Sequence, residues 1–458
     1  MTENERRGVS IGTVFMLLMT LCVLVGCSIV FPRLMGSANI RMDDRAMQSS
    51  TNLNDSLPEL SLSEIPIAPS VTPEVSLPVM DVQPTPEVTQ EPPEILAETP
   101  SIPVEPQING TVTLTFAGSI CMDDLTRKSG YYSDSEKYDF TDNLALIADE
   151  LSSDCTMMTL ESITDTTGNV RQVPNAPDEV MDMLAAAHVD VVALGWNRAM
   201  DRGPEGATKT IRQASERGME TLGLYDSQDD ADRIRLIEIG EVKVAYLHYS
   251  TAITTTGKRQ MNADGASYAL PIISISDSGV ETISADIDRA HQAGAHIVVV
   301  SINWSGSDTI NTTSTKMKKF TQGLADAGAD VIIGAGTKAV REVSWIMGKR
   351  EDGSAHQTLC AWSLGSLLNG ERGNGNVTGM LLHVQLNVTN GNVNFARVTY
   401  TPTYIWRYKQ DDYYRYRVVA SDLPAPGGMD ESQAANAARA FENLKKTLGN
   451  SPVTLRVK

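Results

Sequence analysis

From residue 111 onward, short apolar runs alternate with amphipathic stretches. The apolar runs have the length of buried strands and span residues 111–117, 155–160, 189–194, 242–249, 296–302 and 330–333. The stretches between them have the pattern of amphipathic helices and span residues 144–151, 179–187, 205–217, 279–293 and 314–327. Such alternation predicts a layered α/β domain whose functional residues follow the carboxyl ends of the strands.

The last part of the chain has a different pattern. Three apolar runs at 358–364, 380–388 and 393–405 follow one another without helices between them, which predicts a meander of strands. Beyond Arg407 the sequence is polar until Asp430-Glu431-Ser432-Gln433, a capping box for a helix near 431–448. We therefore expect a main domain over 109–407 and a C-terminal extension over 408–458.

The N-terminus predicts a membrane anchor. An almost uncharged apolar run covers 9–31, which as a helix would be about 35 Å long, enough to cross a hydrocarbon core of about 30 Å. Arg6 and Arg7 precede it, so the positive-inside tendency places a short segment, 1–8, in the cytoplasm. The interpretation is a single-pass protein of the cell membrane whose main domain is extracytoplasmic.

Two alternatives to this anchor stay open. A cleaved signal peptide would have a shorter apolar run and a cleavage site of small residues after it. The segment Leu24-Val25-Gly26-Cys27 resembles a bacterial lipobox, which would make the protein a lipoprotein anchored at Cys27. Against the lipoprotein, apolar residues continue past Cys27 to Phe31. Both the anchor and the lipoprotein would hold the domain on the outer face of a membrane.

Residues 32–108 predict a disordered extracytoplasmic linker. Between 51 and 108 the chain has 12 of its 21 prolines and 10 acidic residues, with neither Lys nor Arg, so this segment cannot form a packed core. The same stretch supplies 10 of the 19 net negative charges, which leaves about −9 for the rest of the chain. That acidity argues against nucleic acid as a partner.

Cysteine usage excludes a complete disulfide framework outside the membrane segment. Cys121, Cys155 and Cys360 each lie in an apolar, strand-like run, and three thiols cannot all pair. We expect them to be small buried hydrophobic residues. A Cys-His-Asp catalytic site is the alternative, but no known signature surrounds any of the three.

Five segments at the predicted strand ends resemble, in order, the CapA-type capsule and poly-γ-glutamate synthesis proteins. They are Phe116-Ala117-Gly118-Ser119, the stretch from Val191 to Gly203, Val298 to Trp304, Gly328 to Lys338, and Ser363-Leu364-Gly365-Ser366. The resemblance covers most of residues 110–405. It implies an αββα two-sheet sandwich similar to the metallophosphoesterase fold, here preceded by a transmembrane helix and a disordered linker.

The first half of the resemblance departs from the family at its polar positions. CapA-like proteins have Gly-Asp where this chain has Gly118-Ser119, and Asn-Leu-Glu where it has Thr159-Leu160-Glu161. Their Asn-Asn-His corresponds to Trp196-Asn197-Arg198, while Asp201 and Gly203 are retained. Of these polar positions, Glu161 and Asn197 keep the family's residue type.

The second half departs in the same way. The family's His-Trp-Gly corresponds to Asn303-Trp304-Ser305, and its His-Pro-His corresponds to Gly336-Thr337-Lys338. Its Ser-Leu-Gly-Asn corresponds to Ser363-Leu364-Gly365-Ser366. The apolar scaffold resembles the family, but most residues that would bind a metal are replaced.

These replacements predict that the chain binds no metal and no cofactor. A metallohydrolase site needs carboxylates and neutral imidazoles. Arg198 and Lys338 would instead place fixed positive charges there, and each opposes a divalent ion by roughly 8 kcal/mol at about 4 Å and a dielectric near 20. The six histidines lie elsewhere, at 188, 248, 291, 296, 356 and 383. Glu161 is the one candidate catalytic residue, and a purely structural role for it is the alternative.

The same cations suggest that the site binds an anion directly. Arg198 and Lys338, with polar side chains around them, would suit a carboxylate or phosphate. The alternative is that the two cations pair with Glu161 and Asp201 and merely fill the former metal position. Trp304 would line a ligand groove or pack in the core. The candidate ligand-binding residues are Ser119, Glu161, Asn197, Arg198, Asp201, Asn303, Trp304, Lys338, Ser363 and Ser366.

Two functions follow from this reading. The first is a membrane-anchored, extracytoplasmic CapA-like protein that binds or helps handle an anionic capsule-type polymer such as poly-γ-glutamate without catalysis. The second is an active hydrolase or transferase of the same family that acts on a poly-γ-glutamate amide or a phosphoester bond through Glu161. The loss of the metal ligands favours the first.

Overall fold

The computed structural model describes residues 109–165, 175–304, 313–350, 353–373, 375–410 and 412–456. The predicted cytoplasmic segment, anchor, lipobox cysteine and linker all lie outside these residues. Within the described part of the chain, no helix is long and apolar enough to cross a membrane. The anchor at 9–31 and the linker at 32–108 therefore stay predictions.

The larger of two main sheets has eight strands. Its strands β1, β5, β6 and β7 are parallel, so their carboxyl ends lie at one edge of the sheet. Its order is β17-β16-β15-β1-β5-β6-β7, and β18 pairs with β16. The strands are β1 (Asn109–Ala117), β5 (Cys155–Thr159), β6 (Val191–Ala193), β7 (Glu220–Leu222), β15 (Thr378–Thr389), β16 (Asn392–Gln410), β17 (Tyr413–Ala420) and β18 (Thr454–Leu455). Strands β15, β16 and β17 form an antiparallel meander beside β1.

The smaller main sheet has six strands in the order β12-β13-β11-β10-β9-β8. They are β8 (Arg235–Ile239), β9 (Val242–Ser250), β10 (Ile297–Asn303), β11 (Val331–Ala335), β12 (Val343–Lys349) and β13 (Ala355–Ala361). The inner four are parallel, and the edge strands β8 and β12 run antiparallel to them. The carboxyl ends of β9, β10 and β11 therefore meet at one edge of this sheet.

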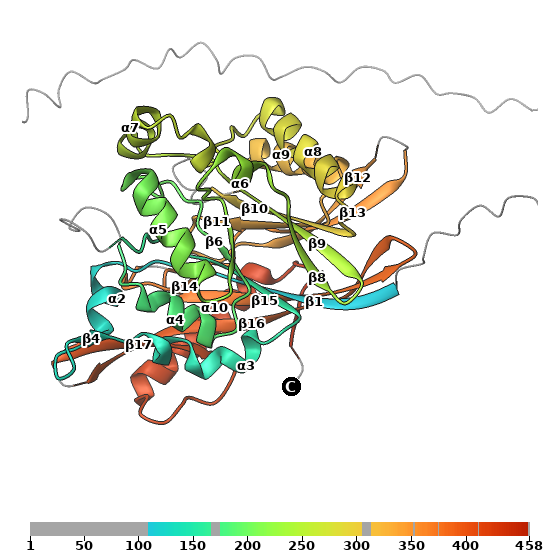
Figure 1. Ribbon diagram of the computed structural model, residues 1–458. Helices are drawn as coiled ribbons and strands as arrows, with labels where there is room; N and C mark the ends of the chain where they lie inside the picture. Colours follow the sequence, from blue (N-terminus) through green and yellow to red (C-terminus); the bar gives the residue numbers. More distant parts are fainter. Residues whose placement is uncertain are drawn as a thin grey trace, which may run out of the picture. The chain divides into compact units, whose positions relative to one another are not determined.

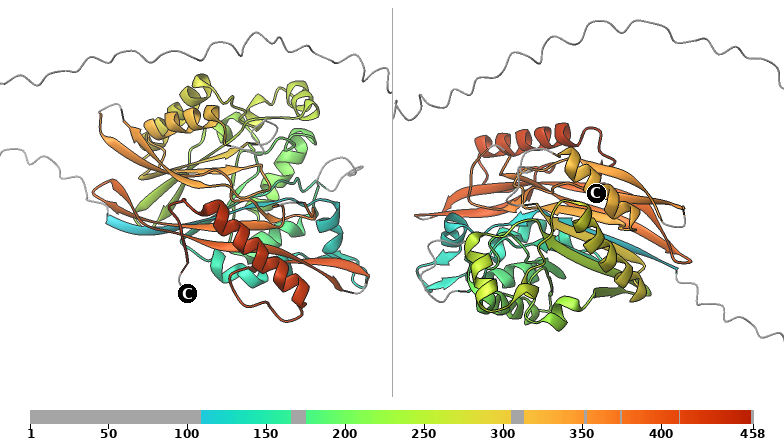
Figure 2. Two further views of the ribbon diagram at one scale, coloured as in Figure 1. Left: turned by 180° about the vertical axis from the view of Figure 1, so that it is seen from behind. Right: turned by 90° about the horizontal axis from the view of Figure 1, so that it is seen from above.

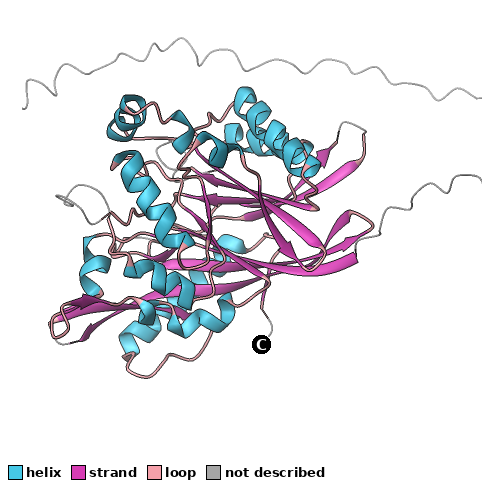
Figure 3. Ribbon diagram, in the orientation of Figure 1, coloured by secondary structure: helices cyan, strands magenta, loops and turns pink. Residues whose placement is uncertain are grey.

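The two sheets pack face to face around a shared core (Figures 1 and 3). Leu114 and Phe116 of β1 face this core, as do Val299 of β10 and Val331 of β11. The alternate residues of β10, among them Val298, pack against helices on the other side of the sheet. Because β10 is buried on both faces, its sequence is a continuous apolar run rather than an alternating one.

Helices cover the outer face of each sheet. On the smaller sheet, Ile283 of α8 (Asp277–Gln292) and Leu324 of α9 (Thr315–Asp326) pack on β10, and the side chains of Ser276 and Ser314 cap these two helices. On the larger sheet, α4 (Glu179–Ala186) and α5 (Gly203–Ser215) contribute to a separate core. The layered α/β arrangement predicted from the alternating pattern is confirmed.

The C-terminal helix α10 (Glu431–Leu448) begins with the capping box that the sequence indicates, formed between Asp430 and Gln433. Ala437 and Ala440 pack on Tyr404 and Trp406 of β16, on the part of the larger sheet beyond the smaller one (Figure 2). Strand β17 belongs to the same sheet, and the predicted boundary between 407 and 408 falls inside β16.

Short elements complete the described fold. They are β2 (Ser119–Ile120), α2 (Asp124–Ser129), β3 (Tyr131–Tyr132), β4 (Lys137–Tyr138), the 3-10 turns η1 (Thr141–Asn143), η2 (Ala145–Ile147) and η4 (Ser267–Ala269), α3 (Ala148–Leu151), α6 (Gln228–Asp232), α7 (Thr255–Ala263) and β14 (Ser366–Leu368). Strand β2 pairs with β14 at the edge where the carboxyl ends of β1 and β5 lie.

Two sequence expectations about elements are wrong in part. The run at 358–364 does not join a meander with the two later runs, because β13 pairs with β11 and β12 in the smaller sheet. The helix expected over 144–151 is broken into η2 and the four-residue α3. Helix α7 and strand β8 were not anticipated, since short edge elements have weak periodicity.

Candidate functional site

The candidate site lies where the carboxyl ends of both sheets meet. Glu161 follows β5 of the larger sheet, and its backbone N–H bonds to Ile120 O of β2 at 2.7 Å. Asn303 is the last residue of β10 in the smaller sheet, and Gly336 follows the neighbouring β11. Parallel strands thus bring together residues that are more than a hundred positions apart in sequence.

Glu161 is the centre of this group. Asn303 donates from Nδ2 to Glu161 Oε1 at 3.3 Å, and the Ser119 side chain and the Gly336 backbone lie close enough to the carboxyl group to lower its pKa. Asn303 is completely buried, and Glu161 and Ser119 are nearly so. Three neutral polar groups therefore lie around a carboxyl group that has almost no contact with solvent.

Burial dominates the electrostatics of Glu161. It raises the pKa of the carboxyl group, while the hydrogen bonds from Ser119 and Asn303 and the charge of Lys338 lower the pKa by less. The net effect is that the pKa of Glu161 lies above its usual value. The structure thus favours the protonated form of Glu161 more than water does.

Lys338 pairs with Glu371 and not with Glu161. Its Nζ forms an ion pair with Glu371, in the loop after β14, and the two side chains are 33% and 52% exposed. The alternative in which Lys338 pairs directly with Glu161 does not hold, although Lys338 acts on Glu161 through its charge. Because the Lys338–Glu371 pair faces water, it is weak.

Arg198 pairs with Asp201, as the sequence suggested. Arg198 Nε donates to Asp201 Oδ2 at 2.9 Å, and the Thr254 hydroxyl donates to the other carboxylate oxygen. Both residues lie in the turn between β6 and α5, and Gly203 there has a φ of 69°, which suits glycine. Asp201 holds this turn against the segment before α7.

The segment 251–254 connects the two groups. Thr251 N donates to Asn303 O at 3.0 Å, and Thr254 N donates to Asn197 O at 2.9 Å. Asn197 thus contributes its backbone carbonyl to this link. The structure places Arg198 and Asp201 in a turn that is joined to the Glu161 group by this segment.

Ser363 and Ser366 organise the loop that carries Lys338. Thr337 Oγ1 donates to Ser363 Oγ at 2.6 Å, and Ser366 N donates to Lys338 O at 3.1 Å. Ser366 also pairs with Ser119 between β14 and β2. These contacts position the backbone around Glu161.

Trp304 lies in the core. Its side chain is completely buried and meets the Phe320 ring edge-on, with the ring centroids 6.2 Å apart. Gly334, on the next strand, leaves space for the indole, because a Cβ at Gly334 would lie 2.5 Å from Trp304 Nε1. The position of Trp304 supports the packing role and not the groove that the sequence left open.

Two acidic residues near the site escaped the sequence reasoning. Asp123 caps α2 and also accepts a hydrogen bond from Gly370 N at 2.8 Å, and Glu371 comes next in that loop.

Cys121 is close enough that Glu161, Asp123 and Lys338 all act on its thiol, whose pKa rises to about 12 chiefly through burial. Cys155 and Cys360 are buried, and none of the three forms a disulfide.

The residues at this edge do not fit a divalent metal ion. Metal sites of hydrolases are built from several carboxylates and imidazoles. Around Glu161 the donors are instead Ser119, Asn303 and a backbone N–H, and an N–H cannot ligate a cation. Within the part of the chain that the structure describes, no three His, Cys, Asp or Glu side chains are grouped to hold a metal ion.

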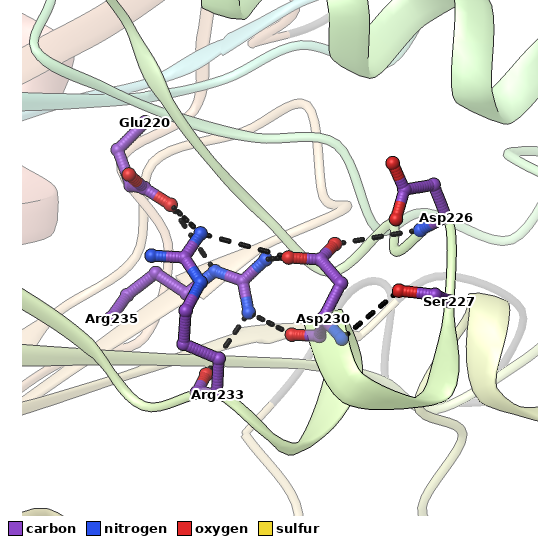
Figure 4. A network of polar contacts seen from close by, with 6 residues as sticks. All are labelled: Glu220, Asp226, Ser227, Asp230, Arg233 and Arg235. Carbon is purple, nitrogen blue, oxygen red and sulfur yellow. Dashed lines mark hydrogen bonds and ion pairs between the residues drawn. The ribbon is translucent and has the colours of Figure 1, made fainter.

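A separate polar network lies at α6, away from these strand ends (Figure 4). Arg233 pairs with Glu220 at 2.7 Å, and Arg235 pairs with Asp230 at 2.5 Å and with Glu220 at 3.3 Å. The two arginines share Glu220 and Asp230, so carboxylates of the described chain neutralise both cations.

Comparison with known proteins reveals two curated relatives. The chain is 26% identical over 160 residues to the capsule biosynthesis protein CapA of Bacillus anthracis, which is 35% of this chain and 37% of that protein. It is also 26% identical over 157 residues to the PGA biosynthesis protein CapA of Bacillus subtilis strain 168, which is 34% of this chain and 38% of that protein. The chain thus matches less than two fifths of each relative's length.

A solved structure and a family profile complete the comparison. A crystal structure described as a novel phosphatase from Mycoplasma pneumoniae aligns with 64% of this chain and 94% of its own, at 12% identity and a TM-score of 0.36. A TM-score of this size does not establish a shared fold. The profile of the bacterial capsule synthesis protein family PGA_cap matches residues 113–371, which is more than half of the chain. The chain therefore belongs to the bacterial capsule synthesis protein family PGA_cap.

Proposed function

We propose that this chain is a membrane-anchored, extracytoplasmic member of its family that binds or helps handle an anionic capsule-type polymer, such as poly-γ-glutamate, without cleaving it. One observation carries the absence of catalysis. Glu161, the candidate catalytic carboxyl group, is buried and lies among neutral polar groups of Ser119, Asn303 and Gly336, while the other retained carboxyl group, that of Asp201, is paired with Arg198. Family membership and the matched relatives support the capsule-type polymer.

The anchor and the location rest on the apolar run at 9–31 and on Arg6 and Arg7 before it. The proposal also includes a metallophosphoesterase-type origin for the two-sheet architecture, supported by the order of the five family segments. In this view the fold persists while the residues that would hold a metal have been replaced.

An active hydrolase or transferase is the second candidate, and one observation favours it. Burial raises the pKa of Glu161, and a raised pKa suits a carboxyl group to act as a general acid. Against it, the carboxyl group is nearly inaccessible, and no His, Cys, Asp or Glu side chain hydrogen-bonds to it in the described residues.

Metal analysis separates the two candidates. The full-length protein, purified in detergent without chelators, should contain no stoichiometric manganese, zinc or iron and should release no product from poly-γ-glutamate or from model phosphoesters. Turnover that disappears in a Glu161→Gln variant would establish the enzyme instead.

Polymer binding is tested by titrating the same protein with poly-γ-glutamate. We expect saturable binding that weakens as salt is added, because the contacts are ionic. Arg198→Ala and Lys338→Ala variants then measure what the candidate site contributes. Absence of binding by the wild-type protein would refute the polymer part of the proposal.

A further inference from the structure

Two arginines near the candidate site differ from most others in the described chain. Arg233 and Arg235 each have a carboxylate partner (Figure 4), as do Arg198, Arg417 and several more. Arg372, in the loop after β14, and Arg407, in β16, have no carboxylate oxygen of a described residue within 4.0 Å. Among the described residues, no carboxylate neutralises their positive charges through an ion pair.

Tyrosine rings and backbone contacts hold both guanidinium groups in place. The Arg407 Cζ lies 4.4 Å from the centre of the Tyr414 ring, and the Arg372 Cζ lies 5.4 Å from the centre of the Tyr416 ring. Arg407 and Tyr416 face each other across β16 and β17, and Arg372 Nη1 donates to Ile405 O at 2.9 Å. We call Arg372, Arg407, Tyr414 and Tyr416 the Arg–Tyr surface.

The two charges are near enough to oppose each other. Although the Arg372 side chain is exposed, partial desolvation of its guanidinium group lowers the pKa of that group, and the charge of Arg407 lowers it further. Like charges kept together without an acidic partner raise the free energy of the free protein, and a bound anion would remove that cost. This is the opposite of the α6 network, whose arginines are satisfied internally.

The Arg–Tyr surface is partly accessible. Tyr414 is 51% exposed and Arg372 is also exposed, whereas Arg407 is half-buried and Tyr416 is buried. Arg372 directly follows Glu371, which pairs with Lys338, the lysine whose charge acts on Glu161. The loop after β14 therefore connects the Arg–Tyr surface to the loop that carries Lys338.

From this arrangement we propose that the Arg–Tyr surface binds the repeating carboxylates of a linear polymer of the γ-linked glutamate type; this inference rests on the proposed function and assigns its binding site. A guanidinium group binds a carboxylate through two parallel hydrogen bonds. The Tyr414 ring offers a flat apolar face to the methylene groups between successive carboxylates. The surface, rather than the buried Glu161 group, makes the main contact with the polymer.

The experiment compares full-length variants in detergent by titration with poly-γ-glutamate. Arg372→Gln and Arg407→Gln remove the charge and keep a polar, hydrogen-bonding side chain, although a shorter one, so the hairpin should still fold. Each should weaken binding roughly tenfold, and the double variant more, because hydrogen bonds between charged groups are the strong ones. Arg407→Lys should recover only part of the affinity, since lysine has no planar fork.

Arg397→Gln is the matched control. Arg397 is exposed on the same strand, β16, but ten residues away, which is about 33 Å along a strand. It should bind like the wild-type protein, and melting temperatures should agree among all variants. If Arg397→Gln weakens binding as much as Arg407→Gln, the effect is one of net charge and the assigned surface is wrong.

Other outcomes separate this inference from the proposed function. If the wild-type protein binds and the double variant binds equally well, the surface assignment fails while the polymer function stands. If the loss is confined to Arg198→Ala and Lys338→Ala, the candidate site makes the contact instead. Tighter binding of a polyphosphate than of poly-γ-glutamate would contradict the proposal that the surface recognises a polymer of carboxylates. No binding by the wild-type protein would overturn both proposals.

Discussion

Asn303 donates a hydrogen bond to Glu161 across the junction of the two sheets, with 3.3 Å between Nδ2 and Oε1. Asn303 ends β10 of the smaller sheet, and Glu161 follows β5 of the larger one. The bond therefore ties together the carboxyl ends of the two sheets, alongside the contact between His248 of β9 and Gly195 O after β6. A polar contact of this kind fixes how the strand ends align.

Replacing Asn303 should destabilise the protein. Asn303→Ala removes a donor from a buried carboxyl group, which costs about 1–3 kcal/mol in the free energy of unfolding. Urea denaturation at pH 7 measures this. Asn394→Ala, at an exposed position in β16, is the control and should change stability by less than about 0.5 kcal/mol. Equal stabilities of the two variants would contradict a structural role for the bond.

Asp330 should make stability depend on pH. Burial raises its pKa from 3.8 to about 7, although Val298 N donates to its Oδ2 at 2.8 Å. Because the folded state holds this proton more tightly than the unfolded state, its stabilising effect is complete below about pH 4 and is lost as pH rises through 7. The loss amounts to up to about 4 kcal/mol.

The Asp330→Asn variant isolates that effect, since an amide oxygen can still accept from Val298 N. Relative to this variant, the wild-type protein should lose stability between pH 4 and pH 7 in denaturation experiments. Parallel stability curves for the two proteins over this range would show that Asp330 does not titrate in this way.

The ion pair between Lys338 and Glu371 should contribute little to stability. Its side chains are 33% and 52% exposed, so solvent screens their attraction. A double-mutant cycle with Lys338→Ala and Glu371→Ala should give a coupling energy of about 0–1 kcal/mol that falls as salt is added. A coupling well above this range would mean that the pair is shielded from water.

Gly223 should be sensitive to substitution because of His248. A Cβ at Gly223 would lie 2.2 Å from His248 Cδ2, and this ring is buried and bonded to Gly195 O at 2.6 Å. Gly223→Ala should cost at least about 2 kcal/mol, because the buried ring has no room to move. Thermal or urea denaturation measures the cost.

Gly218 provides the matched control for this substitution. Its φ of 80° is close to the 75° of Gly223, but no atom lies within 4 Å of its hypothetical Cβ. Gly218→Ala therefore carries the backbone strain alone, about 1 kcal/mol. The additional loss of unfolding free energy in Gly223→Ala, relative to Gly218→Ala, measures the clash with His248. Equal losses in the two variants would show that there is no such clash.

Local patterns predicted much of this fold because they report burial. The apolar run at 296–302 predicts β10, which is buried on both faces, and Asp430 with Gln433 predicts the start of α10. Several of the polar residues after the strands, among them Glu161 and Asn303, lie together where the carboxyl ends of the two sheets meet. The resemblance of five short segments, in their order along the chain, also predicted the family, and the family profile confirms it.

The sequence by itself determined which segments are strands and helices, and which polar residues follow them. Only the tertiary structure decided that β13 joins the smaller sheet, that Lys338 pairs with Glu371, and that Arg372 lies beside Arg407. Periodicity records how deeply a residue is buried but not which residue lies opposite. Partners far apart in sequence are selected by how the sheets and loops pack, and this packing depends on the whole chain at once.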